Sequence, residues 1–344
     1  MKPKHILVIR LSAMGDVAMT VPVLQQLLQQ NPGVQITILT QKLLAPLFDL
    51  LERTTVYTIE TKGKHKGLKG LYKLYRELRK QYHFDTVADL HNVLRSKVLS
   101  FLFKITGIKT ATIDKGRKEK KLLTAKENKQ LVQLKTSFQR YADVFNSLGL
   151  PLNLNTSQAV FSKQPLPETA ISLFTQSIKN ICIAPFAKHE EKMYPLEKMK
   201  TIIKNLGENK LYQVFLLGGG KNETAILNEW EKEFSGVINL AGKFSFKDEL
   251  AIISNMDTMI SMDSANMHLA SLFAVPVVSV WGATHPFAGF YGWAQPVENA
   301  MQIDLYCRPC SVFGNKPCYR GDHACMQQLP EEKIIERVLS IAAC

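Results

Sequence analysis

Short apolar runs alternate with helical patterns in two blocks along the chain, and this alternation constrains the fold most strongly. In the first block, an apolar run from His5 to Leu11 precedes a helical pattern that includes Val21 and Leu24, and a β-rich run follows at Gln35–Thr40. The second block contains five short apolar runs, at Asn180–Ala184, Gln213–Leu217, Val237–Leu240, Thr258–Ser261 and Val275–Val280. The pattern predicts an α/β protein with two Rossmann-like domains that face each other across a cleft.

The remaining patterns set the domain boundaries. A further strand is expected at Thr86–Leu90, and helices at Leu68–Tyr82, Arg95–Thr106, Thr136–Leu148 and Pro330–Ala342. The segment from Gly149 to Pro167 has no clear periodicity and contains three prolines, which is typical of a linker. We therefore expect a first domain over residues 1–160, a second over 161–328 and a C-terminal helix over 329–344.

Composition supports two hydrophobic cores, because the chain has 344 residues and 46% of them are hydrophobic. Its net charge of +13 is concentrated: residues 62–135 hold 20 Lys and Arg against 6 Asp and Glu, a balance of +14, so the remainder sums to −1. Such a block indicates an anionic partner, either nucleic acid, an anionic membrane or a phosphorylated substrate, or else a solvated helical surface. No zinc-finger, RRM or KH signature supports nucleic acid.

The N-terminal apolar run bears on the compartment in which the protein works. The first apolar run is interrupted by Arg10 and is too short for a signal peptide, and no stretch approaches the ~20 apolar residues of a spanning helix. We therefore expect a cytoplasmic protein.

Four of the six cysteines, Cys307, Cys310, Cys318 and Cys325, have the spacing C-x2-C-x7-C-x6-C. A structural zinc is one interpretation, but free thiols are favoured because only one C-x2-C pair is present.

The segment Asp263–Ala270 directly follows a predicted strand, so it would place a helix N-terminus at the carboxyl edge of a sheet. Asp263 or Ser264 can act as N-cap, and the amide N–H groups and positive dipole end of the first turn would suit a diphosphate. The alternative is a simple capped helix, with His268 as a core residue one turn further on.

The glycine cluster Gly218–Gly220 also follows a predicted strand, and Glu223 lies at the start of the next helix. The glycines would allow close backbone approach, and the carboxylate could bind a ribose diol. A tight turn is the alternative, since the cluster matches neither G-x-G-x-x-G nor G-x-x-x-x-G-K-[ST]. Nicotinamide cofactors and P-loop chemistry are therefore disfavoured.

Two further residues could take part in chemistry. Asp16, with Gly15 and Ser12, is expected in the loop after the first strand, where a carboxylate could act as general base or could cap the next helix. Lys192 follows the strand at Asn180–Ala184 and could neutralise developing phosphate charge. No Asp-x-Asp sequence occurs in the chain, so cationic side chains and a helix dipole would have to bind a diphosphate without a bridging metal.

Taken together, these motifs resemble the ADP-heptose:lipopolysaccharide heptosyltransferase family, glycosyltransferase family nine, along nearly the whole chain. The residues that carry the resemblance are Arg10–Asp16 with Thr20 and Pro22, Asp89–His91 with Arg95 and Ser96, Lys192 with Tyr194 and Pro195, Gly218–Gly220, Asp263–Ala270, and Trp281–Thr284 with Pro286. Ala265-Asn266 and Ala187-Lys188 depart from the common pattern and bear on the donor sugar.

The resemblance implies a GT-B architecture with the acceptor bound mainly by residues 1–160 and the nucleotide sugar by residues 161–328. It implies Asp16 as catalytic base in an inverting, metal-independent transfer without a cofactor. Acceptor contacts would come from Ser12, Gly15, His91 and Arg95. Donor contacts would come from Lys192, Gly218, Gly219, Glu223, Asp263, Ser264, His268 and Thr284.

The partners that this resemblance implies are ADP-heptose and a phosphorylated, lipid-linked saccharide. The basic block would then contact the anionic inner face of the inner membrane, and no nucleic acid is expected. Alternatives are another nucleotide sugar or glycan acceptor on the same fold, a sugar-nucleotide-binding protein without catalysis, and a basic nucleic-acid-binding module.

Overall fold

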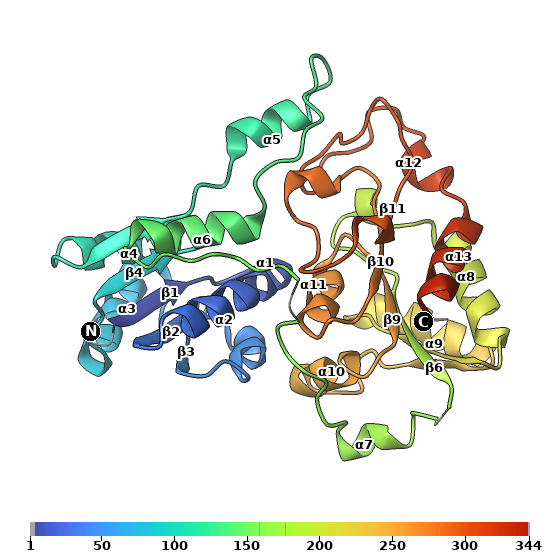
Figure 1. The fold of residues 1–344 in the computed structure, drawn as a ribbon, viewed down its shortest axis with the longest axis horizontal. Coiled ribbons are helices and arrows are strands. Elements are labelled where there is room, and N and C mark those ends of the chain that lie inside the picture. The colour runs from blue at the N-terminus through green and yellow to red at the C-terminus, as the bar shows by residue number, and fades with distance from the viewer. Residues whose placement is uncertain (1–3, 158, 176, 343–344) are drawn as a thin grey trace. The chain divides into compact units, whose positions relative to one another are not determined.

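The computed structural model describes residues 4–157, 159–175 and 177–342. Contacts within the chain divide it into two compact units (Figure 1). Unit 1 comprises residues 1–116 and 135–156, and unit 2 comprises residues 117–134 and 157–344.

Unit 1 is built on a parallel sheet with the strand order β3-β2-β1-β4-β5. Its strands are β1 (Lys4–Ile9), β2 (Val34–Thr40), β3 (Thr54–Thr58), β4 (Thr86–Asp89) and β5 (Lys109–Thr112). Its helices are α1 (Met14–Ala18), α2 (Thr20–Gln30), the 3-10 helix η1 (Lys42–Phe48), α3 (Gly67–Gln81), α4 (Leu94–Lys104) and α6 (Ser137–Ser147). The apolar run in β1 places it at the centre of the sheet, where residues 6–9 are fully buried.

The sequence prediction missed the strands at the two edges of this sheet. β3 (Thr54–Thr58) and β5 (Lys109–Thr112) are short and polar, and their residues are exposed or only half-buried. An edge strand needs no continuous apolar run, because its two faces are covered less completely than those of a central strand. Their signal in the sequence is therefore weak.

The loop that was expected to hold Gly15 and Asp16 is instead helical. Both residues lie in α1 (Met14–Ala18), and α2 (Thr20–Gln30) begins after Met19. The prediction was wrong on this point because a helix of five residues is too short to show an apolar periodicity.

Unit 2 is built on a second parallel sheet, with the strand order β11-β10-β9-β6-β7-β8. Its strands are β6 (Lys179–Ala184), β7 (Tyr212–Leu216), β8 (Val237–Asn239), β9 (Thr258–Met262), β10 (Val277–Val280) and β11 (Ala300–Met301). Its α-helices are α5 (Arg117–Leu123), α7 (Glu168–Ile171), α8 (Leu196–Glu208), α9 (Lys221–Glu233), α10 (Phe246–Ile253), α11 (Ala265–Leu272), α12 (Ala324–Gln327) and α13 (Glu331–Ala342). Three short 3-10 helices complete it: η2 (Glu190–Lys192), η3 (Pro286–Ala288) and η4 (Val297–Asn299).

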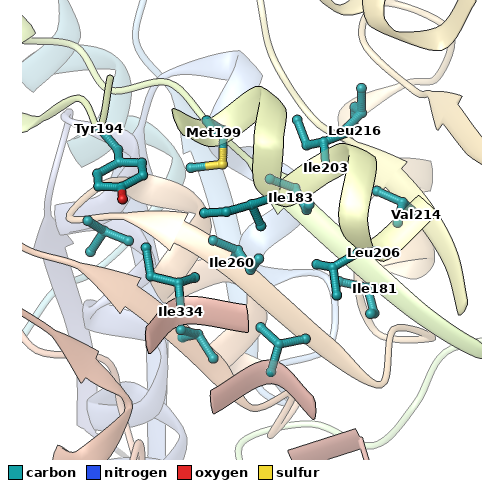
Figure 2. Packing of buried hydrophobic residues seen from close by; sticks show 14 of the residues in the cluster. Ile181, Ile183, Tyr194, Met199, Ile203, Leu206, Val214, Leu216, Ile260 and Ile334 are labelled. Carbon is teal, nitrogen blue, oxygen red and sulfur yellow. The ribbon is translucent and has the colours of Figure 1, made fainter. Parts of the chain in front are cut away.

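The core of unit 2 joins its sheet to the helices α8 and α13. Figure 2 shows Ile183 and Ile260 from β6 and β9 packed against Ile203 of α8, with Ile334 of α13 in the same cluster. Tyr194 is fully buried there, and its hydroxyl donates to the carbonyl oxygen of Leu329 at 2.6 Å. The C-terminal helix is thus part of the unit 2 core.

One segment groups differently from the predicted boundaries. Residues 117–134 fall within the expected first domain, yet by their contacts they belong to unit 2. Leu123 and Leu134 pack against Ala288, and the N–H of Leu134 donates to the carbonyl oxygen of Phe287 at 2.9 Å. The sequence predicted a linker only at Gly149–Pro167 and did not predict that residues 117–134 belong to unit 2.

Candidate active site

Each sheet has one place where the chain connections leave in opposite directions, and in parallel α/β sheets ligands bind at the carboxyl ends of the strands at such a point. In unit 1 this point lies between β1 and β4, which are neighbours in the sheet. In unit 2 it lies between β6 and β9. The predicted site residues can be placed against these two edges.

At the unit 1 edge, Arg10 follows β1 and forms an ion pair with Asp16 of α1. The Arg10 Nη2 and Asp16 Oδ2 atoms are 2.6 Å apart, and Arg10 Nη1 donates to the carbonyl oxygen of Leu90 at 2.6 Å. The Arg10 side chain is 6% exposed and that of Asp16 is 37% exposed. The N-cap residues of α1 and α2 are Ala13 and Met19, so Asp16 is not an N-cap residue. It is therefore held by a buried cation and open to solvent, which suits a proton acceptor.

His91 follows β4 at the same edge. The carboxylate of the buried Asp89 accepts the N–H groups of His91 and Asn92 at 2.9 and 2.8 Å, which fixes the turn after the strand. Burial, together with the nearby positive charge of Arg10, lowers the pKa of His91 to about 4. The ring is therefore neutral near pH 7 and can accept a hydrogen bond from a hydroxyl.

The other predicted acceptor residues lie around this edge. Ser12 lies between β1 and α1, Gly15 lies within α1, and Arg95 is exposed in the first turn of α4. The negative charge of Asp16 raises the pKa of His91, and the positive charge of Arg95 lowers it. Sequence reasoning had not assigned a role to Arg10, although a lone arginine directly after a buried strand was a usable signal.

At the unit 2 edge, Lys192 and Asp263 form an ion pair across the point where the strand order reverses. Lys192 ends the 3-10 helix η2 after β6, and Asp263 directly follows β9. Lys192 Nζ and Asp263 Oδ2 are 2.9 Å apart, and the two side chains are 15% and 8% exposed. Lys192 is thus not the surface lysine that its local sequence alone would suggest.

The helix α11 begins beside this ion pair. Ser264 occupies the N-cap position, but its side chain makes no capping hydrogen bond and its Oγ lies 3.1 Å from Ser261 Oγ. The first-turn amides are therefore not capped by Ser264, and they carry the positive end of the helix dipole. His268 lies one turn further on and is buried. This arrangement suits a diphosphate.

The glycine cluster follows β7, as predicted. The Oε2 atom of Glu223, in the first turn of α9, accepts the N–H of Gly219 at 2.7 Å. A side chain at Gly218 would contact Leu227 at 2.9 Å, whereas one at Gly219 would meet nothing within 4 Å. Gly218 is therefore required by packing, and Gly219 leaves the backbone open. Glu223 fixes this loop and keeps its second oxygen for another partner.

The sequence analysis missed the residues that hold Lys192 in place. The carboxylate of the neighbouring Glu191 accepts the N–H of Cys318 at 3.0 Å and pairs with His323 Nε2 at 3.0 Å. The lysine stem packs against Gly314, where a Cβ would come within 2.6 Å of the Cδ of Lys192. The cysteine-rich segment thus supports the candidate donor site from behind.

Thr284 lies in a loop that is organised by the buried guanidinium of Arg308. That group donates to the carbonyl oxygens of Gly282, Trp281 and Thr284 at 2.6, 3.1 and 3.1 Å, among other acceptors. Thr284 is 1% exposed, and its Oγ1 has no hydrogen-bond partner among the described residues. Arg308, which was given no role from sequence, is the main support of this loop.

The four clustered cysteines do not form a metal site in this structure. Across the described parts of the chain, no group of three or more His, Cys, Asp or Glu side chains is placed to hold a metal ion. Cys307, Cys310, Cys318 and Cys325 are free thiols, and burial raises the pKa of Cys325 to about 11.

The chain thus has two α/β units, each built on a parallel sheet with polar groups at the point where its strand order reverses. This combination defines the GT-B class of architecture. Solved structures share this fold along the whole chain. A glycosyl transferase family 9 structure from Veillonella parvula matches with a TM-score of 0.76 at 20% identity and covers 100% of this chain and 98% of that one. The E. coli ADP-heptose lps heptosyltransferase II matches with a TM-score of 0.68 at 17% identity, over 100% and 99% of the two chains.

Residues 71–317 match the sequence profile of glycosyltransferase family 9 (heptosyltransferase), and the chain belongs to this family. Among named relatives, the lipopolysaccharide core heptosyltransferase of Haemophilus influenzae is 24% identical over 83% of this chain and 80% of its own. Lipopolysaccharide heptosyltransferase 1 of Campylobacter coli is 28% identical over 81% and 84%. The protein is therefore a glycosyltransferase, and the nucleic-acid-binding alternative loses its basis. No helix within the described residues has the length and apolar character needed to cross a membrane.

Proposed function

We propose that this glycosyltransferase transfers heptose from ADP-heptose to an inner-core acceptor of lipopolysaccharide, with inversion and without a metal ion. The observation that carries the proposal is the pairing of Lys192 with Asp263 at the N-terminus of α11, in a chain of the heptosyltransferase family. A solved E. coli relative carries ADP-2-deoxy-2-fluoro heptose, which supports the choice of donor.

On the donor side, unit 2 would bind the diphosphate. Bond cleavage at the anomeric carbon adds negative charge to the leaving diphosphate, so groups that stabilise this charge lower the barrier. The ammonium group of Lys192 and the open first-turn amides of α11 supply fixed positive charge. His268 and Thr284 would line the same region, and Glu223 would accept the ribose hydroxyls. These groups take the place of a bridging cation.

On the acceptor side, Asp16 of unit 1 would act as general base. Its carboxylate takes the proton of the acceptor hydroxyl while that oxygen bonds to the anomeric carbon, and the carbon–oxygen bond to ADP breaks. Attack from the face opposite the leaving group inverts the configuration at this carbon. Arg10 orients the carboxylate at 2.6 Å. The neutral His91, with Ser12, Gly15 and Arg95, would position the acceptor saccharide.

The acceptor is a phosphorylated lipid-linked saccharide, so the enzyme would work on the cytoplasmic side of the inner membrane, in peripheral contact with it. The surplus of Lys and Arg in residues 62–135 supports an anionic partner.

Calorimetric titration tests the donor assignment. The purified protein is titrated with ADP-heptose, ADP, UDP-sugars and GDP-sugars, first with EDTA and then with magnesium. We expect micromolar binding of the ADP ligands in both conditions and loss of that binding in Lys192→Met. A preference for UDP- or GDP-sugars would retain the glycosyltransferase and discard heptose from ADP-heptose. Binding that requires magnesium would refute the metal-independent mechanism.

A further inference from the structure

We propose that one exposed face of unit 1, formed by α4 and the adjacent edge of α3, docks the enzyme on an anionic lipid surface by inserting apolar side chains. This inference rests on the proposed function for its purpose, because a lipid-linked acceptor must be met at a bilayer. The surface itself is defined by exposure, helix geometry and charge.

The centre of this surface is an apolar ridge on α4 (Leu94–Lys104) and its C-cap residue Ile105. Leu94, Phe101 and Ile105 are 77%, 61% and 62% exposed. At 100° per residue, positions i, i+7 and i+11 lie within about 20° of one line along the helix. Three large apolar side chains therefore stand in one row on the outer face, whereas scattered exposed residues would be ordinary.

The helix α3 (Gly67–Gln81) extends the ridge. Leu68 and Tyr72 are 70% and 51% exposed and lie one turn apart. Tyr75, on the next turn, packs its ring against Phe103 of α4 with centroids 5.0 Å apart, so this edge of α3 is the one that adjoins α4. The two helices are neighbours in unit 1 (Figure 1).

Basic side chains border the ridge. α4 carries Arg95, Lys97 and Lys104 and no acidic residue, and α3 carries five Lys or Arg and one acidic residue, Glu77. The two helices therefore hold 3 + 5 = 8 basic residues against one acidic residue. That residue is already engaged, because Glu77 Oε2 accepts from the Tyr57 hydroxyl at 2.8 Å and lies 3.0 Å from His65 Nε2.

This combination selects a lipid surface as the partner. An interfacial helix buries an apolar face at the boundary of the acyl chains while its Lys and Arg side chains reach the anionic headgroups. A nucleic acid would pair with the lysines but offers no apolar layer for Leu94 and Phe101. The position is also appropriate, since α4 begins three residues after His91, at the edge where the acceptor would bind.

Vesicle co-sedimentation tests the proposal without donor or acceptor. The full chain is mixed with vesicles of phosphatidylcholine alone or with added phosphatidylglycerol, at low and high salt. We expect salt-sensitive binding to the anionic vesicles only. Phe101→Gln/Ile105→Gln should weaken it by about tenfold or more, and Lys97→Gln/Lys104→Gln by about 20- to 30-fold, since each charge near the surface contributes about fivefold.

Matched controls lie in unit 2. Leu211→Gln/Val297→Gln removes apolar side chains of similar exposure, 64% and 80%, and Lys210→Gln/Lys232→Gln removes exposed lysines; both should bind like the parent. Equal loss in the controls, or no loss in the α4 variants, overturns the proposal, as does the absence of binding to anionic vesicles. A dimer in sedimentation velocity that Phe101→Gln/Ile105→Gln abolishes would make the ridge a self-association surface instead. Binding of ADP-heptose by the α4 variants, measured in parallel, reports on the proposed function separately.

Discussion

The ion pair between Lys192 and Asp263 allows a prediction that separates stability from catalysis. In Lys192→Met the unbranched stem still packs beside Gly314, but the Asp263 carboxylate, only 8% exposed, loses its cation at 2.9 Å. Removing one partner of a buried pair costs about 3–5 kcal/mol, and the 15% exposure of Lys192 places the loss near the lower end, about 3 kcal/mol. The leaving diphosphate also loses a preorganised cation, so kcat/KM should fall by about 10²- to 10³-fold.

The double variant Lys192→Met/Asp263→Asn removes the stranded carboxylate as well. We expect it to recover most of the lost free energy of unfolding in urea titrations, while kcat/KM with ADP-heptose stays low. Lys198→Met is the matched control, because Lys198 pairs with Glu331 at 3.1 Å with 22% exposure. It should lower stability and leave kcat unchanged. A Lys192→Met enzyme with kcat/KM within threefold of the parent would refute the catalytic role, and recovery of activity in the double variant would refute the reasoning from charge.

Three further predictions concern the supporting structure. Burial lowers the pKa of both His91 and His285 to about 4. Between pH 7 and pH 5 only the unfolded chain takes up protons at these two residues, so the melting temperature should fall as the pH falls. A melting temperature that does not change with pH, or the same fall in His91→Gln/His285→Gln, would contradict this. Arg308→Met leaves several buried carbonyl oxygens without a donor. It should lower the free energy of unfolding, measured by urea titration, by at least about 3 kcal/mol. A loss below about 1 kcal/mol would show that water replaces the guanidinium. A Gly→Ala change inside a helix ordinarily stabilises it by about 1 kcal/mol. In Gly70→Ala, however, the new Cβ would lie 2.7 Å from the Cα of His65, so the melting temperature should fall. A raised melting temperature would refute the packing argument.

Much of the fold could be predicted because central strands of parallel sheets are apolar on both faces. The runs at Asn180–Ala184 and Thr258–Ser261 coincide with β6 and β9 to within one residue at each end. The polar edge strands β3 and β5 lack this signal. The grouping of residues 117–134 with unit 2 depends on contacts such as that between Leu134 and Phe287, which join positions more than 150 residues apart and leave no local pattern.

The candidate site was predictable where strand ends supply polar residues in order along the chain, as for Asp263 after β9. What could not be predicted is which polar side chains meet. The local sequence allowed Asp16 to be a helix cap, whereas its partner is Arg10. Lys192 resembled one surface lysine among many until its partner Asp263, 71 positions away, was known. The pairing of Lys192 with Asp263 follows from the strand order, in which β6 lies beside β9, and a single sequence does not encode that order locally.

Direct measurement of transfer tests the central claim. The parent and Asp16→Asn are incubated with ADP-heptose and a heptose-free lipopolysaccharide acceptor in the presence of EDTA, and products are followed by mass spectrometry and their anomeric configuration by NMR. We expect addition of one heptose with inverted configuration by the parent, and a rate about 10²- to 10⁴-fold lower for Asp16→Asn. Full activity of Asp16→Asn, retention of configuration, or a strict requirement for a divalent metal would contradict it.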